Sequence, residues 1–176
     1  MSTKAASSFA KKKTRTTFAK TKPQPGVFKV AAIQMASGPN VAANLDEAER
    51  LIEMAVEQGA KLVALPEYFP VMGVKETDKV AVREEEGKGP IQRFLANQAK
   101  KHKIWLVGGS IPLEASTSKK VRNSCLVYDD KGKVVARYDK IHLFNLDLGN
   151  EHYHEEATIE PGKKIVTVDT PFGKLG

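Results

Sequence analysis

Short runs of apolar residues interrupt a chain that is otherwise rich in charged side chains, and three of these runs share one form. Residues 28–34, 61–65 and 104–109 are each mostly apolar, without a regular polar face, and each gives way to turn-forming or polar residues. Short continuous runs of this kind are typical of inner strands that are buried on both faces. The pattern therefore predicts three inner strands.

Between these runs, apolar residues recur at helical spacing. The first such segment begins near Asn44, which suits an N-cap and has Glu47 three positions later, and it stops near Gly59. The second opens at Gly89-Pro90, because proline is tolerated in the first turn of a helix. Strands joined by helical crossovers predict an α/β fold with a largely parallel sheet.

The pattern changes in two further segments. Residues 70–88 are highly charged and are interpreted as a loop with a short helix, which would form one wall of a pocket. Residues 123–128 and 133–138 then alternate in polarity, and the Asp-Asp-Lys-Gly sequence at 129–132 is typical of a tight turn. These residues predict a β-hairpin.

The net charge of +7 belongs to one end of the chain. Residues 1–26 contain basic residues and no acidic ones, whereas residues 27–176 are neutral overall. We expect 1–26 to be a disordered basic tail. Contact with nucleic acid or an acidic surface and a role as a transit peptide are alternatives to a simple solvated extension. The neutral body argues against nucleic acid as the main partner.

The cysteine content and the hydropathy of the chain indicate the cellular environment of the protein. The single cysteine excludes an internal disulfide framework and fits a reducing compartment, so we expect a cytoplasmic protein. No stretch approaches the roughly 20 apolar residues of a membrane span. A membrane is therefore not among the expected partners.

Glu67 is the first candidate for chemistry. It follows strand 61–65 and Pro66, at the carboxyl end of a strand, where open α/β sheets place their ligands. The neighbouring Tyr68 and Phe69 predict a partly desolvated carboxylate of the kind that serves as a general base. An exposed loop glutamate with ordinary chemistry is an equal alternative, and this stretch alone does not separate the two.

Lys140 is the second candidate. It follows the predicted hairpin and precedes the apolar residues Ile141, Leu143 and Phe144. A lysine fixed in such a setting would stabilise a developing oxyanion. A surface lysine whose stem covers an apolar patch is the interpretation that the local sequence favours.

Two other groups of residues bear on metal and thiol chemistry. Three histidines lie near Glu155 and Glu156: His142, His152 and His154. Their spacing matches no recognised zinc pattern, so no metal site is predicted. Cys125 lies within a predicted strand without an activating neighbour, and we interpret it as a small buried residue rather than a nucleophile.

A series of motifs runs through residues 28–176: Val30-Ala31-Ala32-Ile33-Gln34-Met35, Leu65-Pro66-Glu67-Tyr68-Phe69, Gly89-Pro90 before a helix, Trp105-Leu106-Val107-Gly108-Gly109-Ser110, Asn123-Ser124, Tyr138-Asp139-Lys140-Ile141-His142-Leu143-Phe144-Asn145 and Pro171-Phe172-Gly173-Lys174-Leu175-Gly176. In this order they resemble the nitrilase superfamily of carbon–nitrogen hydrolases. The chain looks most like the members that act on deaminated glutathione and related ω-amides.

The resemblance implies a four-layer αββα sandwich, of which residues 27–176 would be the N-terminal part. It implies a Glu-Lys-Cys site in which Glu67 is the general base, Lys140 stabilises the tetrahedral intermediate and Glu155 supports the geometry. The family's nucleophilic cysteine follows the segment that resembles Pro171 to Gly176, and Cys125 does not match it. The resemblance thus implies that the domain is incomplete.

These implications lead to a set of expectations about function. The full form would cleave a small linear amide to a carboxylic acid and ammonia, without metal or organic cofactor, and would assemble as a dimer or larger homo-oligomer. The 176 residues alone are expected to be inactive and to expose apolar surface. The alternative is a catalytically inactive fragment or interaction protein whose basic tail contacts a partner.

Overall fold

A computed structural model describes residues 26–149 and 151–176. In chain order the elements are β1 (Lys29–Ala32), α1 (Val41–Glu57), β2 (Ala60–Ala64), α2 (Asp78–Ala81), α3 (Pro90–His102), β3 (Trp105–Val107), β4 (Ile111–Glu114), β5 (Val121–Tyr128), β6 (Val134–Asp139), β7 (Asn145–Leu148), β8 (Glu151–His154), the 3₁₀ turn η1 (Glu155–Ala157), β9 (Val168–Thr170) and β10 (Gly173–Leu175). The expected tail lies almost entirely in residues 1–25, outside the described residues.

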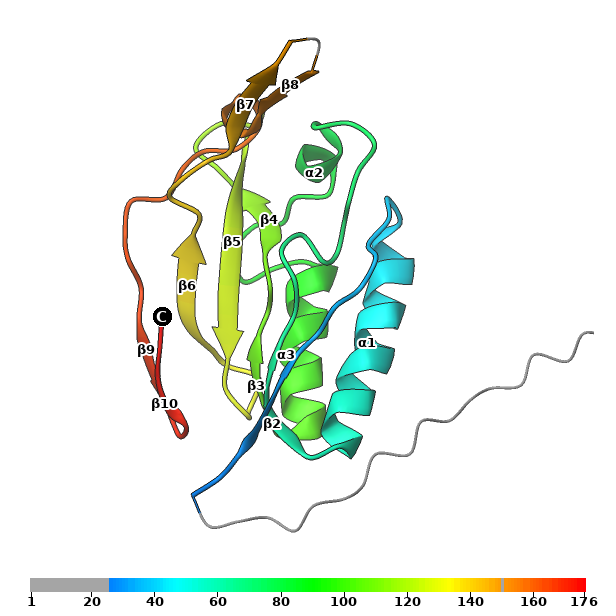
Figure 1. Ribbon diagram of the computed structural model, residues 1–176, viewed down its shortest axis with the longest axis vertical. Coiled ribbons are helices and arrows are strands. Elements are labelled where there is room, and N and C mark those ends of the chain that lie inside the picture. Colours follow the sequence, from blue (N-terminus) through cyan, green and yellow to red (C-terminus); the bar gives the residue numbers. More distant parts are fainter. Residues whose placement is uncertain (1–25, 150) are drawn as a thin grey trace, which may run out of the picture.

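Six strands form one mixed sheet, and α1 and α3 lie against one of its faces (Figure 1). The strands β1, β2 and β3 are parallel to one another. The long strand β5 is antiparallel to β3 and β4 along one edge and to β6 along the other. The predicted α/β class is confirmed, but the prediction of a largely parallel sheet is wrong for the second half, where the short β4–β5 and β5–β6 connections reverse the chain.

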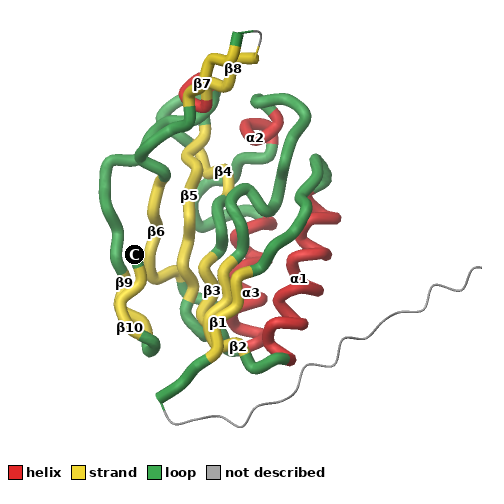
Figure 2. Tube along the Cα trace, viewed as in Figure 1, coloured by secondary structure: helices red, strands yellow, loops and turns green. Residues whose placement is uncertain are grey.

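The core lies between the two helices and the sheet, as the layered arrangement in Figure 2 shows. Each helix buries one apolar stripe, and the strands contribute alternate residues. Fully or nearly fully buried members of this core are Ala48, Ile52, Ile91, Leu95, Ala99, Val63, Leu106, Leu126 and Tyr128. The helical spacing read from the sequence therefore identifies the two helix faces that pack.

The start of α1 differs from the prediction. The N-cap is Asn40, whose Oδ1 accepts a hydrogen bond from the backbone N–H of Ala43 at 3.1 Å. Asn44 lies one turn inside the helix and is buried. Its side chain donates to the backbone carbonyls of Gly38 and Pro70, each at 2.8 Å. Asn44 thus connects α1 to the loop that follows the Glu67 segment, a tertiary role that a capping pattern does not reveal.

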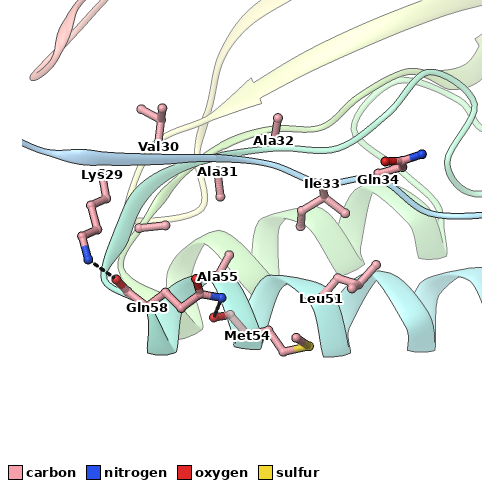
Figure 3. A pocket seen from close by; sticks show the side chains of 11 residues that line it. Lys29, Val30, Ala31, Ala32, Ile33, Gln34, Leu51, Met54, Ala55 and Gln58 are labelled. Carbon is pink, nitrogen blue, oxygen red and sulfur yellow. Dashed lines mark hydrogen bonds between the residues drawn. The ribbon is translucent and has the colours of Figure 1, made fainter. Parts of the chain in front are cut away.

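The strand β1 lies at the edge of the sheet in the described residues, not inside it as predicted. Val30 is 60% exposed. In Figure 3, Ala31 and Ile33 point toward α1, whereas Val30 and Ala32 point away from it. The apolar run at 28–34 therefore has one face on the helices and one face open.

The two irregular predictions fare better. Residues 70–88 form a loop that contains the short helix α2, and β5 and β6 form the expected hairpin. In its turn, Gly132 has a φ of +80°, and a Cβ there would lie 2.4 Å from the carbonyl oxygen of Ala96 on α3. A glycine is required because the turn packs directly on the helix.

None of the helices in the described ranges is both long and apolar enough to cross a lipid bilayer.

Candidate active site

Glu67 lies in a loop that is fixed at the carboxyl end of β2. The backbone N–H of Tyr68 donates to Ser110 Oγ at 3.0 Å. Gly109 approaches the same loop so closely that a Cβ would lie 2.1 Å from the carbonyl oxygen of Pro66. Tyr68 itself has a φ of +48°, in the left-handed region that side chains other than glycine rarely adopt. The turns after β2 and β3 therefore hold one another, and Glu67 projects from between them.

Lys140 directly follows β6, and its backbone is bonded on both sides. Its N–H donates to the carbonyl of Asn123 on β5, and its carbonyl accepts from the N–H of Gly162, at 2.9 and 2.8 Å. The side chain of Lys140 reaches Glu67, with 3.1 Å between Nζ and Oε1. Residues 73 positions apart in the sequence are thus in contact.

Glu155 is the third predicted residue at this place. Its carboxylate lies 3.0 Å from Lys140 Nζ, and its Oε2 accepts a hydrogen bond from the backbone N–H of Phe144 at 2.7 Å. The Glu155 N–H in turn donates to the Phe144 carbonyl at 3.1 Å. The structure therefore brings all three predicted site residues together, with Lys140 between two carboxylates.

The surroundings of Lys140 favour its charged form. Partial burial lowers the pKa of Lys140, but its hydrogen bonds with Glu155 and Glu67 outweigh that effect, so the net pKa is raised above its ordinary value. Lys140 is therefore an ammonium ion at neutral pH. A fixed positive charge of this kind can stabilise a negative charge that develops in a bound reactant.

One expectation about Glu67 is wrong for the described residues. The side chain of Glu67 is 56% exposed, so the carboxylate is not desolvated there. The flanking aromatic residues Tyr68 and Phe69 are buried instead, 8% and 0% exposed. The two aromatic side chains therefore lie in the interior, whereas Glu67 faces the open side of the sheet.

Asn123 is a member of the site that residue-by-residue reasoning did not single out. Its Nδ2 donates a hydrogen bond of 2.7 Å to Glu67 Oε1. A signal was present, because asparagine is depleted in strands and this one occupies a strand of a predicted hairpin. The partner, however, lies 56 positions earlier, beyond the reach of local patterns.

Glu67, Lys140 and Asn123 border a hollow of about 360 Å³. Its lining comprises Leu65, Glu67, Val107, Gly109, Ser110, Asn123, Cys125, Tyr138 and Lys140. None of the described residues 70–88 belongs to it, so the predicted pocket wall is not found here. Burial raises the pKa of the Cys125 thiol to about 11, which keeps it protonated at neutral pH.

Other parts of the described chain offer less chemistry. A hollow of about 610 Å³ between β1 and α1 is lined mainly by aliphatic side chains, and its Lys29 donates to the carbonyl of Gln58 (Figure 3). No group of three His, Cys, Asp or Glu residues in 26–149 and 151–176 is arranged to hold a metal ion. His154 pairs with Asp147 at 3.1 Å, and the side chain of His152 lies outside the described part.

A family described as carbon–nitrogen hydrolase matches residues 29–176, and the chain belongs to it. Nitrilase homolog 2 of Dictyostelium discoideum is 38% identical over 151 residues, which are 85% of this chain and 45% of that protein. Omega-amidase NIT3 of Saccharomyces cerevisiae is 38% identical over 158 residues, 85% of this chain and 53% of the yeast protein. The deaminated glutathione amidase of Synechocystis is 38% identical over 154 residues, 85% of this chain and 56% of its own length.

Solved structures agree with the sequence comparisons. The Caenorhabditis elegans NitFhit protein matches with a TM-score of 0.70 and 30% identity, over 84% of this chain and 36% of that one. Saccharomyces cerevisiae Nit3, a member of the nitrilase superfamily, matches with a TM-score of 0.66 and 35% identity, over 78% and 49%. The resemblance to the nitrilase superfamily and the predicted nitrilase-type fold are confirmed. The chain spans about half the length of the curated relatives it matches.

Proposed function

We propose that this chain provides the general base and the oxyanion-stabilising lysine of an amidase. The amidase converts a small linear ω-amide to a carboxylic acid and ammonia. Family membership and the relatives named omega-amidase and deaminated glutathione amidase support this reaction class. The observation that carries the proposal is the cluster itself. Lys140 Nζ lies 3.1 Å from Glu67 Oε1 and 3.0 Å from Glu155, beside a hollow large enough for a small amide.

Each residue has a role that follows from its contacts. Glu67 is the exposed carboxylate and acts as the general base. Lys140 directs its ammonium group toward the developing oxyanion. Glu155 holds Lys140 from the other side and is itself fixed by the Phe144 N–H, so we assign it a positioning role.

The nucleophile in this proposal is a cysteine thiol supplied by a part of the whole protein outside these 176 residues. Cys125 does not qualify, because its thiol stays protonated at neutral pH and has no hydrogen-bonding base among the described residues. Glu67 takes the proton of the attacking thiol as the sulfur–carbon bond forms. The carbon–nitrogen bond then breaks, and ammonia leaves with a proton returned by Glu67. Water activated by Glu67 hydrolyses the resulting thioester.

Ammonia release from an ω-amide acid tests this function in the longest natural product that contains the chain. We expect Glu67→Gln to lower kcat by about a hundredfold or more, because the base is lost while the shape is kept. Glu47→Gln is the matched control, since Glu47 is a glutamate on α1 whose side chain is 43% exposed and pairs, among the described residues, with Arg50. Equal activity of the Glu67→Gln and parent proteins would refute the assignment.

The same assay can be applied to residues 1–176 alone. Residues 1–176 by themselves should release no ammonia above background, because their one thiol is Cys125. Ammonia release by this chain that survives Cys125→Ser would contradict the proposed chemistry.

The expected homo-oligomer stays a prediction, which sedimentation of the active product would test.

A further inference from the structure

Asn123 is a buried polar residue that contacts both members of the Glu67–Lys140 pair. Its side chain points to Glu67, with 2.7 Å between Nδ2 and Oε1. Its backbone carbonyl accepts the N–H of Lys140 at 2.9 Å. The residue is only 2% exposed, on the central strand β5. One rigid position in the sheet therefore fixes where the carboxylate and the ammonium group meet.

The contacts of Glu67 fall on one of its two oxygens. Oε1 accepts from both Asn123 Nδ2 and Lys140 Nζ, whereas no hydrogen bond from the described residues reaches Oε2. An exposed glutamate side chain without such contacts would rotate among several conformers. With Oε1 held twice, Oε2 is the oxygen left free to accept a proton.

We propose that Asn123 is the positioning residue of this site: it fixes Glu67 so that Oε1 faces Lys140 and Oε2 serves as the proton-accepting oxygen. This inference rests on the proposed amidase function. Asn123 acts through Glu67 and does not touch the reacting atoms. Its Oδ1 is buried and has no hydrogen-bond partner among the described residues, which leaves the Glu67 contact as the side chain's one polar interaction.

The first test measures this geometry in the longest natural product that contains the chain, by NMR titration of the Lys140 side chain. Asn123→Leu removes the donor, so Glu67 is no longer held near Lys140. The pKa of Lys140 is raised in part by Glu67, and we expect it to fall toward its ordinary value in this variant. If Asn123→Leu does not fold, Asn123→Thr carries the test, because its shorter side chain suits a strand and lacks the amide donor.

Ser124 provides the matched control. It is the next residue on β5, is 0% exposed, and donates to Asp139 Oδ1 at 2.6 Å. Ser124→Ala therefore also removes one buried hydrogen bond from β5, but none that involves the Glu67–Lys140 pair. We expect it to lower stability without moving the pKa of Lys140. An unchanged Lys140 pKa in the folded Asn123 variant, or the same shift in Ser124→Ala, would overturn the proposal.

The second test is kinetic and uses the longest natural product. Misplacement of a catalytic group by about an ångström costs on the order of a hundredfold in rate. We expect Asn123→Leu to lower kcat by about that factor while KM changes by less than about threefold, since ground-state binding is unaffected. Ser124→Ala should keep both parameters. A rise in KM with unchanged kcat would contradict the positioning role.

The two tests separate this inference from the function on which it rests. If no product hydrolyses an ω-amide but the Lys140 titration shifts as expected, the proposed function fails and the geometric role of Asn123 stands. If the amide is hydrolysed and Asn123→Leu changes neither the titration nor kcat, the function stands and the assignment to Asn123 is wrong.

Discussion

The two faces of the sheet differ in what covers them. On the helical face, Val63, Leu106 and Leu126 are at most 1% exposed, beneath α1 and α3. On the opposite face, Leu62, Val107 and Cys125 are only half-buried, and the Glu67–Lys140 contact lies at the end of the same strands. One face therefore holds the fold together, while the other presents reactive groups. A strand supplies both because its side chains alternate.

Two glutamates show the same contrast between a buried structural position and an open reactive one. Glu84 is 6% exposed beside α3, where Oε1 accepts from the N–H of Ile91 at 2.6 Å and Oε2 from that of Gln92 at 3.1 Å. It caps a helix whose own N-cap, Gly89, has no side chain to do so. Glu67 is exposed and bonds to side chains instead. A buried carboxylate here serves structure, and the exposed one is the candidate for chemistry.

The largest effect should come from a matched pair of leucines on the two faces. Leu106→Ala leaves a cavity in the closed core, and we expect a loss of about 2–5 kcal/mol in the free energy of unfolding. Leu62→Ala removes the same atoms from the open face and should cost clearly less. Equilibrium unfolding in urea measures both. Equal losses would mean that both faces are equally buried in solution.

A smaller difference is expected between the two glutamates. Glu84→Gln places an amide N–H₂ against backbone N–H groups and should cost about 1–3 kcal/mol of stability. Glu67→Gln affects an exposed ion pair and should cost less than about 1 kcal/mol, although it removes the proposed base. Thermal and urea unfolding compare the two variants. A Glu67→Gln protein that is less stable than Glu84→Gln would reverse the contrast.

The smallest effect concerns pH. Because the folded-state pKa of Lys140 is raised, its ion pairs contribute stability that is fully present below the unfolded-state pKa of about 10.4. That contribution is lost as the pH rises through the higher folded-state value. The difference in unfolding free energy between the parent protein and Lys140→Met should therefore shrink above about pH 10.4. Urea unfolding from pH 8 upward measures it, and a difference that grows with pH would contradict the assignment.

Local patterns predicted the elements better than their arrangement. The strand at 61–65, the helix from Pro90 and the 123–138 hairpin depend on nearby residues, and they are found where expected. The antiparallel pairing of β3 with β5 depends on contacts distant in sequence. The edge position of β1 does too, so apolar runs alone predicted the wrong surroundings.

The site shows the same limit. Glu67 and Lys140 were singled out from their local sequence, and Glu155 from the family resemblance. The structure brings the three together, while their roles stay predictions. Neither the exposure of Glu67 nor its bond to Asn123 follows from local sequence, because both depend on how β5 lies beside the end of β2. The predicted cap of α1, Asn44, is wrong for a similar reason: Asn40 caps the helix, and Asn44 instead bonds to the distant carbonyl of Pro70.

The separation of 73 positions between Glu67 and Lys140 has a consequence for biosynthesis. During translation Glu67 emerges well before Lys140, so the two side chains can meet only after the intervening elements, including β5 and β6, have been synthesised. Contacts of such long range are slow to form and come late in folding. A nascent chain that ends before Lys140 would therefore carry the Glu67 carboxylate without the ammonium group that pairs with it.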